Sequence, residues 1–176
     1  KLVKMSINFG EIRVGETARK HILDCLERNW ITSGKKVKLF EEQWGSLFNY
    51  KYNKAVSSGT DAVINLVSSL YRFGAKRGDE VITPKTRAIM VVHTMGRPCD
   101  MTVINGIAQK HELIVFEDAC EAHGAIYMGD YIGTNSHGSA YSFYTAHLIN
   151  CGEGGMVSTN NAIVAASVGS TRSHGR

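Results

Sequence analysis

The stretches Ala88-Ile89-Met90-Val91-Val92 and Leu113-Ile114-Val115-Phe116 decide the fold class of this chain. Both are short, continuous apolar runs, which are typical of strands buried on both faces of a parallel sheet. Between them, Asp100 to Lys110 begins with an acid suited to an N-cap and continues with apolar residues at helical spacing. Strand, helix and strand in this order predict a βαβ unit.

Further elements are predicted on both sides of this unit. Apolar residues at helical spacing predict two N-terminal helices, one with Ile22 and Leu26 and one with Phe40 and Trp44. We expect both helices to pack against the body of the domain. The remaining predicted elements are a strand at 55–57, a helix from about residue 60 to residue 70, and strands at 140–143 and 156–158. Together they predict an α/β domain of three layers around a mixed sheet.

The composition is that of one globular domain. Of the 176 residues, 43% are hydrophobic and 20% are charged, which is enough apolar material for a core. The net charge of +4 comes from cations scattered among acids, so nucleic-acid binding is not favoured. The one local cluster, Lys35 to Lys38, is interpreted as the solvated face of an amphipathic helix.

The spacing of the cysteines and the hydropathy of the sequence indicate the cellular compartment of the protein. The four cysteines form no CxxC pair, which favours reduced thiols (Cys25, Cys99, Cys120 and Cys151). No apolar run approaches the roughly 20 residues that cross a bilayer, and the N-terminus lacks a signal-peptide core. We therefore expect a cytoplasmic protein that binds neither membrane nor nucleic acid.

A turn of small residues, Ser57-Ser58-Gly59-Thr60, lies between a predicted strand and a predicted helix. The amides of a helix N-terminus point outward, and the helix dipole favours an anion there. The turn therefore predicts a phosphate site at Ser58, Gly59 and Thr60. The alternative is a plain N-cap, because serine, glycine and threonine begin many helices.

Asp118 follows the apolar strand that ends at Phe116. Its carboxylate is therefore expected at the carboxyl edge of the sheet, where α/β proteins bind ligands. An acid that caps the next turn is the structural alternative. Nearby, Cys120 and His123 have a two-residue gap, but no second pair completes a zinc site, so no metal site is predicted.

Three motifs follow Asp118 in a fixed order. The segments Glu117 to Gly124, Ser142 to His147 and Gly152 to Met156 supply an acid, a hydroxyl, a basic residue and a glycine cluster. This spacing resembles the DegT/StrS family of sugar-nucleotide aminotransferases and dehydratases, and the resemblance covers nearly the whole chain. It implies the fold type I large domain of pyridoxal-phosphate-dependent transferases and a homodimer with sites at the subunit interface.

The resemblance also implies a cofactor and a substrate class. The cofactor would be pyridoxal 5′-phosphate or pyridoxamine 5′-phosphate, and the substrate a nucleotide-linked 4-keto sugar in deoxysugar or surface-polysaccharide biosynthesis. By the same resemblance, Asp118 would keep the pyridinium nitrogen protonated and Ser142 would donate to the phosphate. Glu121 stands where the family usually has a glutamine at the ring. A solvated Glu121 and an ordinary strand serine at Ser142 are the structural alternatives.

His147 stands where the family has its Schiff-base lysine. Imidazole is not a primary amine and cannot make that covalent link, but an unperturbed imidazole, with a pKa of about 6.5, can act as a general base. With Glu121, it resembles the 4-keto-6-deoxy-sugar 3-dehydratases, in which His147 would remove a proton so that the C3 hydroxyl leaves. The alternatives are an aminotransferase with a lysine from elsewhere, since Lys85 and Lys110 miss the motif, and a catalytically silent binding module.

Two features predict that segments are absent from this chain. The motif at 78–82 runs directly into the motif at 83–89, whereas similar chains separate them. The chain also stops at Arg176, where the large domain of the family would turn toward its second half. We therefore expect residues 1–176 to be a partial large domain with an N-terminal helical segment, a missing segment near 82–85 and a missing C-terminal domain. A natural deletion is the alternative at the internal junction.

Overall fold

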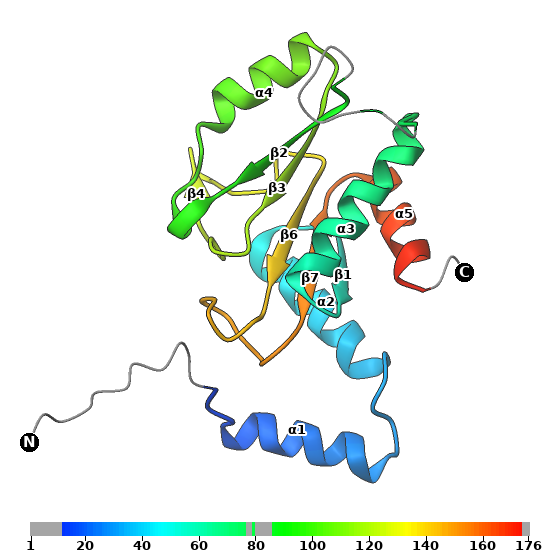
Figure 1. Ribbon diagram of the computed structural model, residues 1–176. Coiled ribbons are helices and arrows are strands. Elements are labelled where there is room, and N and C mark those ends of the chain that lie inside the picture. Colours follow the sequence, from blue (N-terminus) through cyan, green and yellow to red (C-terminus); the bar gives the residue numbers. More distant parts are fainter. Residues whose placement is uncertain (1–11, 77–78, 80–85, 174–176) are drawn as a thin grey trace, which may run out of the picture.

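A five-stranded mixed sheet forms the centre of the protein in a computed structural model that describes residues 12–76, 79 and 86–173 (Figure 1). The strand order is β1-β7-β6-β3-β2, with β1 at Tyr52–Val56, β2 at Ala88–Val92, β3 at Ile114–Asp118, β6 at Gly138–Ser142 and β7 at Gly155–Thr159. Strands β2, β3 and β6 are parallel, and β7 is antiparallel to both of its neighbours. The predicted α/β class and mixed sheet are confirmed.

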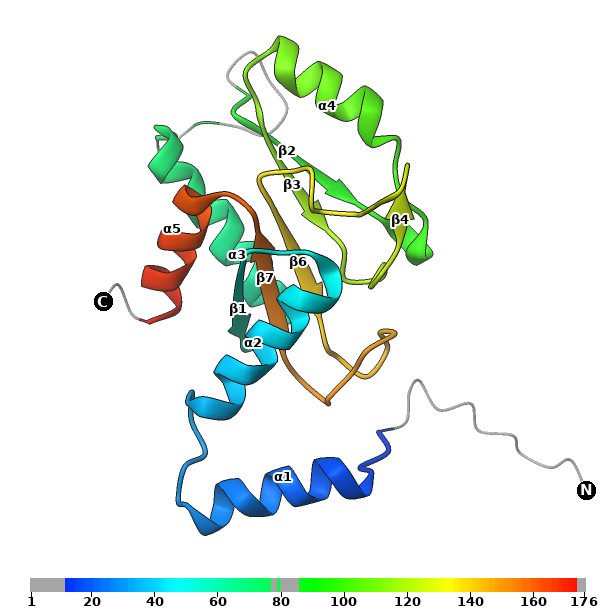
Figure 2. The same ribbon diagram turned by 180° about the vertical axis from the view of Figure 1, so that it is seen from behind.

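Helices cover both faces of this sheet (Figures 1 and 2). The helices are α1 at Glu16–Glu27, α2 at Lys35–Phe48, α3 at Gly59–Ser69, α4 at Met101–Lys110 and α5 at Ala162–Arg172. Helices α3 and α5 pack together on one face, whereas α2 packs on the other, so the domain has three layers. Shorter elements are the 3₁₀ turns η1 (Leu70–Phe73) and η2 (Thr94–Gly96) and the hairpin of β4 (Ile126–Tyr127) and β5 (Asp130–Tyr131).

The core follows the alternation of side chains along the central strands. On β6, Ala140 faces the α3 and α5 side, whereas its neighbour Tyr141 packs with Trp44 of α2. On β7, Val157 and Met156 divide in the same way. Both β6 and β7 are buried along their whole length, which explains why their sequences do not alternate between apolar and polar residues.

Several boundaries differ from the prediction. Strand β1 begins at Tyr52 rather than residue 55, because its polar first half pairs with β7. Helix α5 and the β4–β5 hairpin were not predicted. Helix α4 begins as predicted, with Asp100 accepting a hydrogen bond from the Val103 amide at 3.2 Å. The junction at 82–85 lies outside the described residues.

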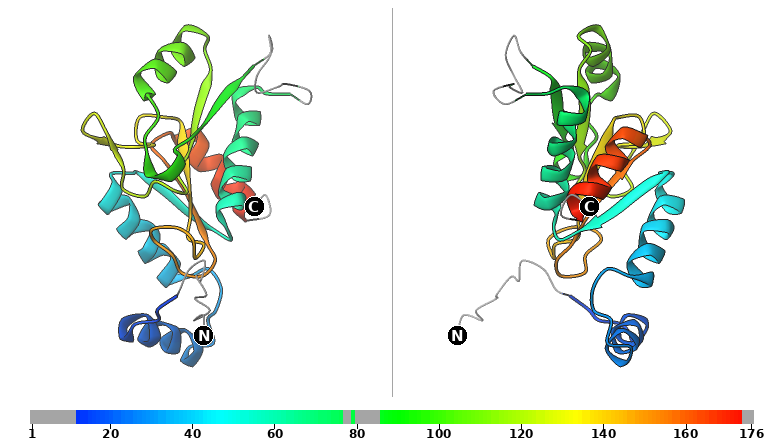
Figure 3. Two further views of the ribbon diagram at one scale, coloured as in Figure 1. Left: turned by 60° about the vertical axis from the view of Figure 1, so that its left-hand side comes forward. Right: turned by 90° about the vertical axis from the view of Figure 1, so that its right-hand side faces the viewer.

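Both predicted N-terminal helices are present, but the prediction that they pack against the body of the domain is right only for α2. Helix α2 buries Trp44, Gly45 and Phe48 against the sheet. Helix α1 buries none of its residues and lies apart from the body of the domain (Figure 3). Within the described ranges, the structure contains no helix whose length and apolar character would let it cross a bilayer.

The C-terminal ends of four strands, β1, β6, β3 and β2, lie at one edge of the sheet. Val56 and Ser142 are both level with Gly155, where β7 begins. Asp118 and Val92 end β3 and β2 side by side at the same edge. The segments that leave this edge therefore contain most of the predicted site residues.

Candidate functional site

The turn at Ser58 is held against the end of β6. A Cβ atom on Gly59 would lie 2.5 Å from Ser142 Cβ and 2.9 Å from Ser142 Oγ, so only glycine allows this approach. A Cβ on Gly155 would collide with the carbonyl oxygen of Ser58. The predicted residues Ser58, Gly59 and Ser142 are thus brought together, and Thr60 follows in the first turn of α3.

The same turn is also an N-cap, as the structural alternative proposed. Ser58 Oγ accepts a hydrogen bond from the Asp61 amide at 3.1 Å, and Ser57 donates to the Asp61 carboxylate. Capping uses the Asp61 amide and leaves the amides of Gly59 and Thr60 in the first turn, where no helix carbonyl precedes them. These two amides and the hydroxyl of Ser142 form a donor set that suits a phosphate.

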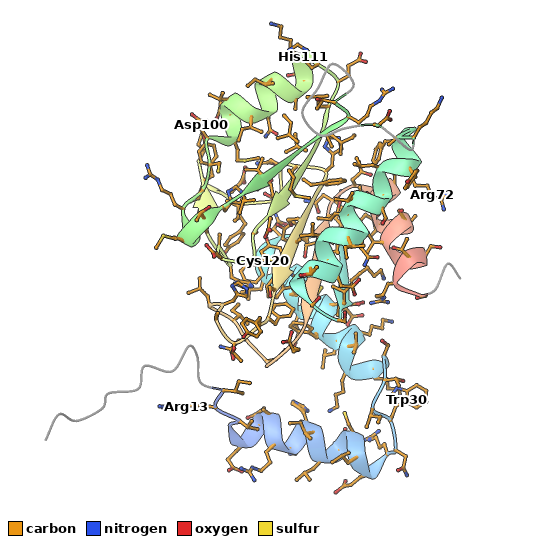
Figure 4. The ribbon with its side chains drawn as sticks, viewed as in Figure 1. Arg13, Trp30, Arg72, Asp100, His111 and Cys120 are labelled. Atoms are coloured by element: carbon orange, nitrogen blue, oxygen red, sulfur yellow. The ribbon has the colours of Figure 1, made fainter. Side chains whose placement is uncertain are left out.

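Cys120, shown in Figure 4, follows β3 and lies next to Gly59. Its sulfur would lie 3.1 Å from a Cβ on Gly59. Burial and then the neighbouring Asp118 carboxylate raise the pKa of the Cys120 thiol far above its usual range. The thiol therefore stays neutral and places no negative charge beside an anion at the turn.

Asp118 is the last residue of β3, and Glu121 lies in the turn that follows this strand. Asp118 Oδ1 accepts a hydrogen bond from the Cys120 amide at 3.1 Å, so this carboxylate does cap the turn. It remains partly accessible at the sheet edge. Glu121 is exposed, but Glu121 Oε2 accepts a hydrogen bond from the Met95 amide at 2.6 Å and is therefore held in place.

His147 lies in the loop that joins β6 to β7. Its amide donates to the carbonyl of Tyr144 at 3.0 Å, and the amide of Tyr144 donates to Ser142 Oγ at 3.3 Å. The imidazole is half-buried, and its centroid is 6.3 Å from that of His123 at an interplanar angle of 61°. His147 is thereby tied both to the end of β6 and to the turn after β3.

His123 is the residue at this site whose position was not predicted. Its ring packs against Trp44, Tyr141 and Phe143, with centroids between 5.5 and 6.0 Å. Both of its nitrogens are buried without a hydrogen-bond partner among the described residues. Burial, and then the imidazole of His147, lower the pKa of His123 to about 4. In the sequence, His123 was indicated only by its position in the segment Glu117 to Gly124.

Metal ligands do not gather at this edge. In the part of the chain that the structure describes, no group of three His, Cys, Asp or Glu side chains could hold a metal ion. The described site is thus a set of hydrogen-bond donors at Gly59, Thr60 and Ser142, two carboxylates and one half-buried imidazole.

Known proteins resemble this chain in both sequence and fold. The sequence pattern of the DegT/DnrJ/EryC1/StrS aminotransferase family matches residues 13–86 and 79–176. The GDP-perosamine synthase of Caulobacter vibrioides is 31% identical over 211 residues, covering 96% of this chain and 56% of that protein. The dTDP-4-dehydro-2,6-dideoxy-D-glucose 3-dehydratase of Saccharopolyspora spinosa is 39% identical over 125 residues, covering 70% of this chain and 27% of that protein.

Solved structures share the fold. A GDP-4-keto-6-deoxymannose-3-dehydratase superposes with a TM-score of 0.88 at 23% identity, covering 97% of this chain and 55% of that chain. An aminotransferase from Psychrobacter cryohalolentis gives a TM-score of 0.81 at 26% identity, covering 92% and 51%. The chain thus spans about half the length of the Caulobacter protein and of these two solved structures. The matches in sequence show that it belongs to the DegT/DnrJ/EryC1/StrS aminotransferase family.

Proposed function

We propose that this chain is the coenzyme-binding part of a 4-keto-6-deoxy-sugar 3-dehydratase that uses pyridoxamine phosphate and has His147 as its base. The donor set at Gly59, Thr60 and Ser142 fits the phosphate of that coenzyme, and Asp118 fits its pyridinium nitrogen. When bound, pyridoxamine phosphate supplies an electron sink that allows a hydroxyl next to a keto group to leave.

Each residue of the site has a separate task in this proposal. The amides of Gly59 and Thr60 and the hydroxyl of Ser142 bind the phosphate and so fix the position of the ring. Asp118 holds a proton on the ring nitrogen through its negative charge. One imidazole nitrogen of His147 accepts the proton that is removed from carbon, because a neutral imidazole is an effective base near neutral pH.

The placement of His147 is the observation that carries this proposal. Its imidazole lies in the loop that leaves Ser142 and packs beside the turn after β3. Lys110 is at the C-terminal end of α4, next to the start of β3 and therefore at the opposite edge of the sheet. Lys85 lies outside the described residues.

A sugar-nucleotide aminotransferase is the second candidate. Relatives named as transaminases, such as the dTDP-3-amino-3,6-dideoxy-alpha-D-galactopyranose transaminase of Aneurinibacillus thermoaerophilus at 33% identity, support it. Such a reaction needs a primary amine at the coenzyme, and the imidazole of His147 cannot supply one. A silent binding module remains the third candidate, and a folded chain that binds no coenzyme would favour it.

Replacement of His147 tests the proposal. In the longer enzyme of which this chain is the proposed part, we expect His147→Asn to leave pyridoxamine phosphate bound, since the phosphate and ring contacts are made by other residues, and to abolish loss of the C3 hydroxyl. Binding is measured by coenzyme fluorescence, and dehydration by mass spectrometry of a nucleotide-linked 4-keto-6-deoxy sugar. His111→Asn is the matched control, because His111 caps the far end of α4.

The outcomes separate the candidates. Unchanged dehydration by His147→Asn would remove this residue from the mechanism. Amino transfer, rather than dehydration, by the unsubstituted protein would establish the second candidate. A His147→Lys variant that gains a covalent coenzyme absorbance band would support the placement of residue 147 at the reactive end of the coenzyme.

The extent of the domain and the assembly are also proposals. We propose that residues 1–176 correspond to a partial large domain that acts as a cytoplasmic homodimer on a nucleotide-linked sugar. The alignment with the Caulobacter protein runs over 211 positions, more than the 176 residues of the chain. It therefore contains residues that have no counterpart here, which supports a missing internal segment.

A further inference from the structure

A buried, hydrogen-bonded pair of titratable side chains lies beside the strands that end at the candidate site. His93 follows β2 and Glu117 is in β3, and their side chains are 0% and 1% exposed. His93 Nε2 and Glu117 Oε2 are 2.7 Å apart. Buried charged groups are unusual unless they are fully hydrogen-bonded, so this pair calls for an explanation.

The surrounding amides assign the proton between the two side chains. The Cys99 amide donates to His93 Nδ1 at 3.1 Å, so this nitrogen carries no proton. The Gly133 amide donates to Glu117 Oε2 at 2.8 Å, so this oxygen is an acceptor. The proton therefore lies on Nε2 of His93, which donates to Glu117.

Hydrogen bonds of His93 hold both ends of the segment that follows β2. At one end, the amide of His93 donates to the carbonyl of Asp118 at 3.1 Å. At the other end, Cys99 is fixed by the ring of His93. Between these anchors, Met95 has a left-handed backbone with φ of 54°, which a side chain such as methionine seldom adopts.

The strained residue is the one that contacts the site. The Met95 amide donates to Glu121 at 2.6 Å, while the Met95 side chain is 90% exposed and makes little contribution to the core. Packing of the Met95 side chain therefore does not explain the unusual backbone conformation. In this conformation the Met95 amide points toward Glu121 and donates to its carboxylate.

We propose that His93 and Glu117 are positioning residues that fix the loop 93–99 so that the Met95 amide holds the carboxylate of Glu121 at the coenzyme site. The inference that the loop is ordered depends only on these hydrogen bonds. The inference that Glu121 acts at a coenzyme site rests on the proposed function. Neither His93 nor Glu117 needs to touch a ligand for this effect.

Two replacements of Glu117 separate this role from general stability. In Glu117→Gln, the side-chain oxygen can take the place of Oε2 and still accept from His93 and Gly133. In Glu117→Met, a side chain of similar length removes the acceptor. The control is Leu66→Ala, which lowers stability in the separate core beneath α3 without touching loop 93–99.

Hydrogen exchange and coenzyme binding are the two measurements. We expect Glu117→Met to speed exchange of the Cys99 and Met95 amides about tenfold and to weaken pyridoxamine phosphate binding about tenfold. Glu117→Gln should restore both values to near those of the unsubstituted chain. Leu66→Ala should not single out these two amides.

Equal exchange in Glu117→Met and in the unsubstituted chain would overturn the positioning role, and so would the same change in Leu66→Ala. If the unsubstituted chain binds no pyridoxamine phosphate, the proposed function fails while the exchange result still decides the ordering of loop 93–99. Faster exchange with unchanged coenzyme affinity would show that the loop is ordered by the pair but does not position Glu121 for binding, and would overturn that part of the proposal.

Discussion

The unpartnered imidazole of His123 makes the stability of this protein depend on pH. In the unfolded chain its pKa is the ordinary value near 6.5, and in the folded protein it is lowered to about 4. Between these values the unfolded chain binds the proton and the folded protein does not. The stabilising effect of a neutral His123 is therefore complete above about pH 6.5 and is lost as the pH falls toward 4.

The magnitude follows from the two pKa values. Going from about pH 7.5 to about pH 5, His123 alone lowers the free energy of unfolding by about 2 kcal/mol. A His123→Phe variant keeps an aromatic ring against Trp44 and Phe143 and has no nitrogen to protonate. Urea unfolding of both proteins at several pH values measures the difference directly.

The comparison between the two proteins measures His123 together with its electrostatic coupling to His147. Burial also lowers the pKa of His137, but that residue is present in both, so its contribution cancels. We expect His123→Phe to be more stable at every pH, since two buried nitrogens without partners are removed, and the advantage to grow by about 2 kcal/mol toward pH 5. An advantage that stays constant with pH would refute the reasoning.

Two further substitutions test the packing of the site. Gly155→Ala should lower the free energy of unfolding by about 2 kcal/mol or more and weaken phosphate binding, because the new Cβ meets the backbone of Ser58; unchanged thermal unfolding would contradict the close contact. Trp44→Phe should cost about 1–3 kcal/mol, because Trp44 Nε1 donates to buried Ser158 Oγ at 3.0 Å. A Trp44→Phe and Ser158→Ala double variant should lose less than the sum of the two single changes, and a strictly additive loss would speak against the bond.

The sequence was most informative where periodicity and burial agree. The unit β2-α4-β3 could be predicted because its strands are apolar runs and Asp100 caps its helix. Helix α5 escaped prediction because alanine, serine and glycine give it no clear apolar stripe, although Asn161 caps it. Strand β1 begins with polar residues, and its pairing with β7 over a long sequence separation decided its start.

The sequence also predicted which residues of the candidate site lie at the ends of strands. Strand ends placed Asp118, Ser142 and the turn at Ser58 at one edge, because parallel strands bring their carboxyl ends together. The contact of His123 with His147 depends on the path of the loop after β6, which no local pattern specifies. The resemblance to the family assigned His147 a role before any geometry was available.

Helix α1 has a lower local stability than the rest of the domain. It has 12 residues, none of them buried, and it is attached to α2 by the ion pair of Lys36 with Asp24 and the contact of Lys36 with His21. A helix this short is marginal in water without a packed apolar face. Local unfolding of α1 therefore needs far less free energy than global unfolding. A protease should accordingly cleave the chain near Arg28, at the end of α1, much faster than it cleaves the strands of the sheet.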